Sequence, residues 1–106
     1  MVALLHWRKY SMPRPTQAMA QAARKGLKMR QASPPSRQGG TRVGVARANQ
    51  FARRENVSLE TVRRTYSFLS RAKTYYKPGQ DTPGTQAYLL WGGPAGLRWA
   101  KRILGK

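Results

Sequence analysis

The stretch "ENVSLETVRR", residues 55–64, indicates a tight turn followed directly by the start of a helix. Asn56 tolerates the left-handed conformation that a tight turn needs, so we expect the turn to centre on it. Ser58 is a strong N-cap residue, and Val57 and Val62 have the spacing of a hydrophobic staple around it. Glu60 lies in the first turn, where the helix dipole favours a negative charge. The stretch therefore predicts a well-capped helix after a turn.

The same stretch, with the residues before it, fits part of the general helix-turn-helix pattern over residues 48–64. Ala52 is the small residue that the pattern wants in its first helix, whereas Thr65 departs from the apolar residue that it wants in its second. The fit would turn three polar residues outward on the second helix: Thr61, Arg63 and Arg64. Arginines there can contact guanine edges or phosphates. A recognition helix and an ordinary capped helix in a basic protein both remain open.

The rest of the chain also has helical periodicity, and no alternating β-type run occurs. We therefore expect an all-α fold, a small bundle of four to five short helices. The expected helices are residues 16–30, 43–53, 59–73, 85–90 and 94–104. Thr41 and Thr85 are expected N-caps, Pro94 suits a first helical turn, and Gly105 suits a helix stop.

Composition shifts divide the chain of 106 residues into four parts. We expect an extended N-terminal arm over 1–15, a basic helix over 16–30, a Pro/Gly linker over 31–42 and a compact helical domain over 43–106. A chain of this length holds one small core. The predicted core residues are Leu59, Val62, Tyr66, Leu69, Leu90, Trp91, Leu97, Trp99 and Ile103.

Positive charge dominates the composition. Lysine and arginine number 21 against three acidic residues, which gives a formal net charge of +18. Such a chain repels itself, and its natural complement is a polyanion, with nucleic acid first, an anionic membrane second and an acidic protein surface third. The predicted polyanion-binding residues are Arg24, Lys25, Lys28, Arg30, Arg37, Arg42, Arg47, Arg53, Arg54, Thr61, Arg63 and Arg64. Tyr75, Tyr76 and Lys77 are candidates for base stacking or for an interface.

Catalytic and metal sites lack the residues that they need. The chain has no cysteine, His6 is its one histidine, and its three acids are scattered. We therefore expect no enzyme, no metal and no cofactor. "WGGPAG", residues 91–96, predicts a tight helix-to-helix turn and not a phosphate loop, because Pro94 removes an amide that would bind phosphate. No run approaches the ~20 apolar residues of a membrane span, and we expect neither a signal peptide nor a membrane partner.

Three blocks of the sequence together resemble a small module found in tailed-phage proteins, around head genes and sometimes attached to larger phage proteins. The blocks are "AMAQAARKGLKMR" (18–30), "GGTRVGVARANQFARRENVSLETVRRTYSFLSR" (39–71) and "AYLLWGGPAGLRWAKRIL" (87–104). The chain departs from that pattern twice. "AKTYY", residues 72–76, stands where the family usually has a His-Glu-type acidic segment, and Pro94 stands where it tends to have Asp. Both departures remove acidity.

The resemblance implies a setting, namely a large phage assembly. Together with the charge it predicts a non-enzymatic, basic structural protein of the virion, present in the phage head and in host cytoplasm during assembly. Its partners would be the backbone of packaged DNA, phage capsid proteins, or both. Two alternatives stay open: a cement or minor capsid protein without a DNA role, and a helix-turn-helix regulator that reads a DNA site. A ribosome-associated protein is a more distant alternative.

Overall fold

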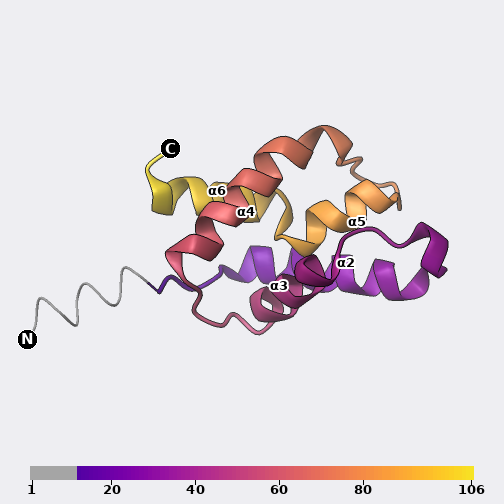
Figure 1. Ribbon diagram of the computed structural model, residues 1–106, viewed down its shortest axis with the longest axis horizontal. Coiled ribbons are helices and arrows are strands. Elements are labelled where there is room, and N and C mark those ends of the chain that lie inside the picture. Colours follow the sequence, from indigo (N-terminus) through magenta and orange to yellow (C-terminus); the bar gives the residue numbers. More distant parts are fainter. Residues whose placement is uncertain (1–11) are drawn as a thin grey trace, which may run out of the picture.

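The computed structural model describes residues 12–106, and every regular element in that range is helical (Figure 1). The elements are α2 (Gln17–Ala32), η1 (Pro35–Arg37), α3 (Arg42–Ala52), α4 (Leu59–Ala72), η2 (Lys73–Tyr75), α5 (Pro83–Leu90) and α6 (Gly93–Leu104), where η marks a short 3₁₀ turn. The all-α prediction is confirmed. Residues 1–11 of the predicted N-terminal arm lie outside the described residues.

Short polar side chains start most of these helices. The Ser58 hydroxyl accepts the Thr61 N–H at 3.2 Å, and the Thr41 hydroxyl accepts the Gly44 N–H at 3.2 Å, as predicted. The predicted cap at Thr85 is wrong by one turn. Thr82 caps α5 and accepts the Thr85 N–H at 3.1 Å, because Pro83 fits the first helical position.

Helix α2 lies at the centre of the packing. It packs against α3, α5 and α6, while α4 packs mainly on α6 (Figure 1). A Cβ atom at Gly26 would lie 2.9 Å from the Leu90 backbone nitrogen, so only glycine allows α2 and α5 to approach this closely. The compact unit therefore begins earlier than the expected range of 43–106, because α2 is part of it.

The core joins residues from all five α-helices of the described chain. Of the predicted core residues, Val62, Leu69, Leu90, Trp91 and Trp99 are buried. Tyr66, Leu97 and Ile103 are half-buried and pack against that core, whereas Leu59 is half-buried and is not part of it. Met19 and Phe51 are fully buried but were missing from the predicted core. The residues around Met19 and Phe51 are mostly small, so α2 and α3 have a weak hydrophobic pattern. For this reason the sequence did not reveal how much these helices contribute to the core.

The turn between α3 and α4 is built differently from the expectation. The left-handed residue is Arg54, with φ of 54°, and not Asn56. Asn56 instead donates from Nδ2 to the Met12 carbonyl at 2.6 Å, and the Val57 N–H donates to the Pro13 carbonyl at 2.9 Å. The segment before α2 thus lies along the turn, and Asn56 serves that contact.

The helix-turn-helix pattern requires the small residue of its first helix, Ala52 of α3, to face its second helix, α4. In the described residues, α3 packs on α2 and α5, whereas α4 packs on α6. Thr61, which was expected to face outward, is buried, and its hydroxyl lies 3.2 Å from that of Ser58. Thr65 is fully buried and donates to the Thr61 carbonyl at 2.8 Å, which explains how a polar residue fits there. The geometry therefore gives no support to a recognition helix.

The predicted linker is a fixed part of the fold. The Gly39 N–H donates to Oε1 of buried Gln86 at 2.8 Å, and Nε2 of Gln86 donates to Ser33 Oγ at 2.9 Å and Asp81 Oδ1 at 2.7 Å. A Cβ atom at Gly39 would collide with the Pro83 carbonyl. One buried glutamine therefore holds the α2–α3 connection against the loop that precedes α5.

Candidate nucleic-acid interface

Three of the predicted polyanion-binding arginines bind backbone carbonyls of their own chain. Arg24 Nη2 donates to the Ala52 carbonyl at 2.6 Å, at the end of α3. Arg30 Nε donates to the Gly39 carbonyl at 3.0 Å, and Arg54 Nε donates to the Pro15 carbonyl at 2.8 Å. These guanidinium groups satisfy carbonyls at loops and helix ends, which gives them a structural role.

Three more predicted arginines have side-chain partners. Arg53 pairs with Glu55, and Arg64 Nη2 lies 3.3 Å from Glu60 Oε1. Arg47 Nη1 donates to Gln50 Oε1 at 3.0 Å, and its Nε is buried without a hydrogen-bond partner in the described chain. The two ion pairs are exposed, so each contributes little to stability. All three arginines therefore have partners within the chain, which reduces their availability to an external anion.

Three further cations also have partners: Arg14 Nε donates to the Arg54 carbonyl, Arg71 donates to Ser67 Oγ, and Lys106 lies over the Tyr66 ring. The other ten described cations form what we call the free basic set. Its members are exposed and make no ion pair, side-chain hydrogen bond or cation–π contact with the described residues. Lys25, Lys28, Arg37, Arg42, Arg63 and Lys77 of this set were predicted, whereas Lys73 was not. The sequence also indicated Arg98, Lys101 and Arg102 as phosphate contacts on the last helix, and their spacing places these three on the outer side of α6.

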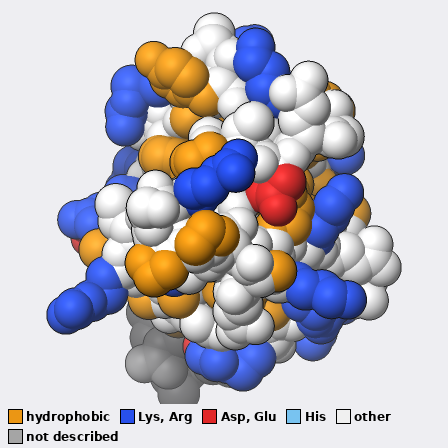
Figure 2. Space-filling model, turned by 90° about the vertical axis from the view of Figure 1, so that its right-hand side faces the viewer, with side chains coloured by type: hydrophobic (Ala, Val, Ile, Leu, Met, Phe, Trp, Pro, Cys, Tyr) orange, Lys and Arg blue, Asp and Glu red, His pale blue; other side chains and the backbone are white. Residues whose placement is uncertain are grey.

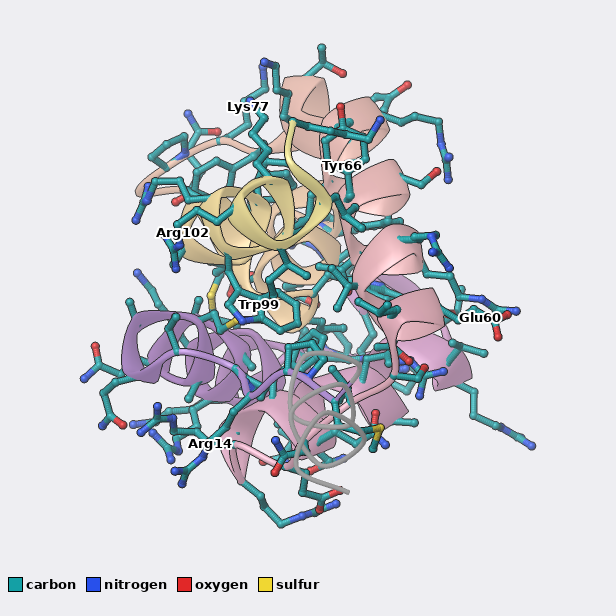
Figure 3. All side chains as sticks on the ribbon, turned by 90° about the vertical axis from the view of Figure 1, so that its left-hand side faces the viewer. Arg14, Glu60, Tyr66, Lys77, Trp99 and Arg102 are labelled. Atoms are coloured by element: carbon teal, nitrogen blue, oxygen red, sulfur yellow. The ribbon has the colours of Figure 1, made fainter. Side chains whose placement is uncertain are left out.

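Cations of the free basic set lie on several sides of the fold. Lys25 and Lys28 belong to α2, and α2 packs against α6. The two helices approach closely, because Ala22 Cβ of α2 would lie 3.3 Å from a Cβ atom at Gly93 of α6. In Figure 3, Arg102 lies at the left, above α2, and Lys77 lies at the top, whereas Glu60 lies at the right, on α4. Lysine and arginine also surround the end of the molecule shown in Figure 2, where acidic side chains cover little surface.

The carboxylates do not form a site of their own. Glu55 and Glu60 pair with arginines, and Asp81 accepts from Gln86. In the part of the chain that the structure describes, no group of three or more His, Cys, Asp or Glu side chains could hold a metal ion. No described helix is long and apolar enough to span a bilayer. His6 lies outside the described residues.

The two candidate stacking tyrosines separate in the structure. The Tyr76 ring stacks on Tyr88 with 4.7 Å between centroids, and burial raises the pKa of Tyr88, with a smaller contribution from the neighbouring Tyr76 hydroxyl. Tyr75 is 67% exposed and stacks on no other described ring. Of the pair, only Tyr75 offers a free aromatic face.

Tyr75 borders an apolar groove beside α4, which we call the α4 groove. It consists of two hollows of about 330 and 300 Å³ that share Phe68 and Arg71. Its apolar walls are Val43, Phe68, Ala72, Tyr75, Ala87 and Trp91, and its cations are Arg64 and Arg71. Phe68 and Trp91 stack at 5.4 Å. The sequence did not predict this groove, because its walls come from three separate parts of the chain.

Comparison of the chain with protein-family models, with curated proteins and with solved structures finds no match. No relative therefore assigns a role to the free basic set or to the α4 groove.

Proposed function

We propose that the chain is a non-enzymatic structural protein of a phage head that binds the backbone of packaged DNA without reading its sequence. The same basic surface could hold an acidic inner face of the capsid shell. The setting comes from the three sequence blocks that resemble a tailed-phage module. The binding chemistry comes from the charge of the chain.

One observation carries the proposal. The free basic set is spread over α2, α3, α4 and α6. Each of the three acidic side chains, in contrast, forms an ion pair or accepts a hydrogen bond within the chain. Exposed cations without internal partners are available to phosphates, and DNA contacts of this kind fix position without carrying sequence information. A distribution on several sides suits a protein surrounded by neighbouring DNA segments better than a reader of one groove.

Binding to two unrelated DNA duplexes over a range of salt concentrations tests the proposal. We expect equal affinity for both duplexes and a log–log slope of about −0.9 for each phosphate neutralised. Salt-insensitive binding, or no binding in low salt, would contradict it. A marked preference for one duplex would instead favour a regulator.

The location in a particle needs a second measurement. The chain should co-purify with intact phage heads, and its release should follow the loss of DNA when heads are emptied. Retention on emptied heads in a copy number set by capsid symmetry would instead assign it to the shell as a cement protein.

A further inference from the structure

The α4 groove combines an exposed aromatic ring, an apolar hollow and two arginines. Tyr75 and Val43 are two of the three large apolar residues that are exposed in the described chain, and both border this groove. A duplex backbone offers only phosphates and sugars to such a surface, so it leaves the apolar hollow unexplained. The groove therefore calls for a ligand that presents both anionic and planar apolar groups.

We propose that the α4 groove binds single-stranded nucleic acid, with one base stacked on Tyr75 and the phosphates beside Arg71 and Arg64. Aromatic platforms next to a cationic groove are the usual means of binding single strands, because every base has a stacking face. The proposal extends the proposed function to a second form of nucleic acid and rests on the same affinity for phosphate. It uses a different surface, so the two can fail separately.

The two arginines are suitably placed on one helix. Arg64 and Arg71 are seven residues apart, which separates them by about 10 Å along α4 and lets them serve different phosphates of one strand. Arg71 donates to Ser67 Oγ, which keeps its side chain along the groove. Arg64 pairs with Glu60 at 3.3 Å, but both side chains are more than half exposed, so a phosphate can replace this weak partner.

The composition of the groove argues against other occupants. No acidic residue lines either hollow, so the ligand is expected to be anionic. A second copy of this chain is disfavoured, because two molecules of net charge +18 repel each other. An acidic amphipathic protein segment fits the charge, but it makes no particular use of a free aromatic face on Tyr75.

Fluorescence anisotropy with a labelled oligothymidylate of about 15 nucleotides tests the proposal, since single-strand sites span roughly 4–16 nucleotides. Tyr75→Ala should weaken binding by about 5- to 150-fold, the usual effect of removing one stacked base. Tyr75→Phe should keep the affinity, because the ring remains. Both variants should fold, which circular dichroism can check, because Tyr75 is 67% exposed.

A matched duplex and a matched charge variant complete the test. Tyr75→Ala should leave duplex affinity unchanged, whereas Lys28→Ala, on α2 and outside the groove, should weaken duplex binding and leave single-strand affinity unchanged. Photo-crosslinking with an iodouracil-substituted oligonucleotide should place the adduct on Tyr75. An unchanged single-strand affinity in Tyr75→Ala, or adducts only on α2 and α6, would overturn the groove proposal and leave duplex binding intact.

Two further outcomes are decisive. Absence of binding to either nucleic acid in low salt would remove both proposals together. If an acidic amphipathic peptide binds and Tyr75→Ala abolishes that binding while oligothymidylate binding is unaffected, the groove is a protein-docking site and the single-strand proposal is wrong.

Discussion

Oε1 of Gln86 accepts the backbone N–H of Gly39 at 2.8 Å, across 47 residues of sequence. Gln86 is 1% exposed, and its amide nitrogen also donates to Ser33 and Asp81. A buried side chain with this many partners is costly to replace, because each partner left unsatisfied loses its hydrogen bond. The connection between α2 and α3 thus depends on one residue of α5.

Gln86→Leu should lower the free energy of unfolding by about 2–4 kcal/mol, because it leaves the Gly39 N–H without its partner and removes two further hydrogen bonds. Urea unfolding followed by circular dichroism measures the change. Gln21→Ala, at an exposed position of α2, is the control and should change stability by less than about 0.5 kcal/mol. Equal stability of the two variants would show that the Gln86 bonds contribute nothing net.

Gly26→Ala should destabilise the fold, even though alanine is the better helix former. The added methyl group would lie 2.9 Å from the Leu90 nitrogen and 3.0 Å from Leu89 Cβ, so α2 and α5 would have to move apart. Overpacking of this kind costs about 1–3 kcal/mol. Thermal unfolding tests it, and a raised Tm in the variant would mean that the helices separate freely.

Arg54→Gly should be more stable than Arg54→Ala by about 1 kcal/mol. Both variants lose the hydrogen bond to the Pro15 carbonyl, but only glycine adopts φ of 54° without strain. Comparing their midpoints of urea unfolding isolates the backbone term. If alanine proves equal to glycine, the turn relaxes out of the left-handed conformation when the arginine is removed.

Stability should fall at alkaline pH through Tyr88. Its folded-state pKa lies above the ordinary value of 10.0, chiefly because burial disfavours the phenolate. The folded state therefore holds this proton more tightly than the unfolded state, and the resulting stabilisation is complete below pH 10 and declines as the pH rises toward the folded pKa. Tyr88→Phe should show a smaller alkaline decline in the free energy of unfolding. An identical decline in both proteins would assign it to other groups.

Substituting both Lys25 and Lys28 by Gln should make the log–log salt slope of duplex binding shallower by about 1.8, if each lysine neutralises one phosphate. Arg53→Gln is the control, because Arg53 pairs with Glu55 and should change the slope less. Fluorescence anisotropy at several salt concentrations measures both. A larger change for Arg53 than for the lysines would place the DNA elsewhere on the surface.

Local signals predicted a good part of the fold. Caps at Thr41 and Ser58, the stop at Gly105 and the apolar face of α4 depend on neighbours within one or two turns, so the sequence alone reveals them. The role of Asn56 was misread, because its actual partner, the Met12 carbonyl, lies 44 residues away. Helix α2 was set apart from the compact unit because small residues such as Ala20 and Gly26 carry its packing.

The candidate interface was harder to predict for a related reason. From charge alone, every lysine and arginine is a candidate for binding a polyanion. Arg24, Arg30 and Arg54 instead bind backbone carbonyls that lie beside them only in the folded chain. Lys73 was left out of the prediction although it is exposed just after α4. The α4 groove joins Val43, Tyr75 and Trp91, and no local pattern links residues so far apart.

The hydrogen bond from Trp99 Nε1 to the Arg14 carbonyl, at 2.9 Å, joins positions 85 residues apart. Helix α6 follows the segment Met12–Thr16 by four other α-helices, so this segment cannot acquire Trp99 as a partner until α6 has been synthesised. Closing such a long loop is slow compared with forming local helices. The turn residues Arg54, Asn56 and Val57 can bind this segment early, and the bond from Trp99 is added only after α6 forms.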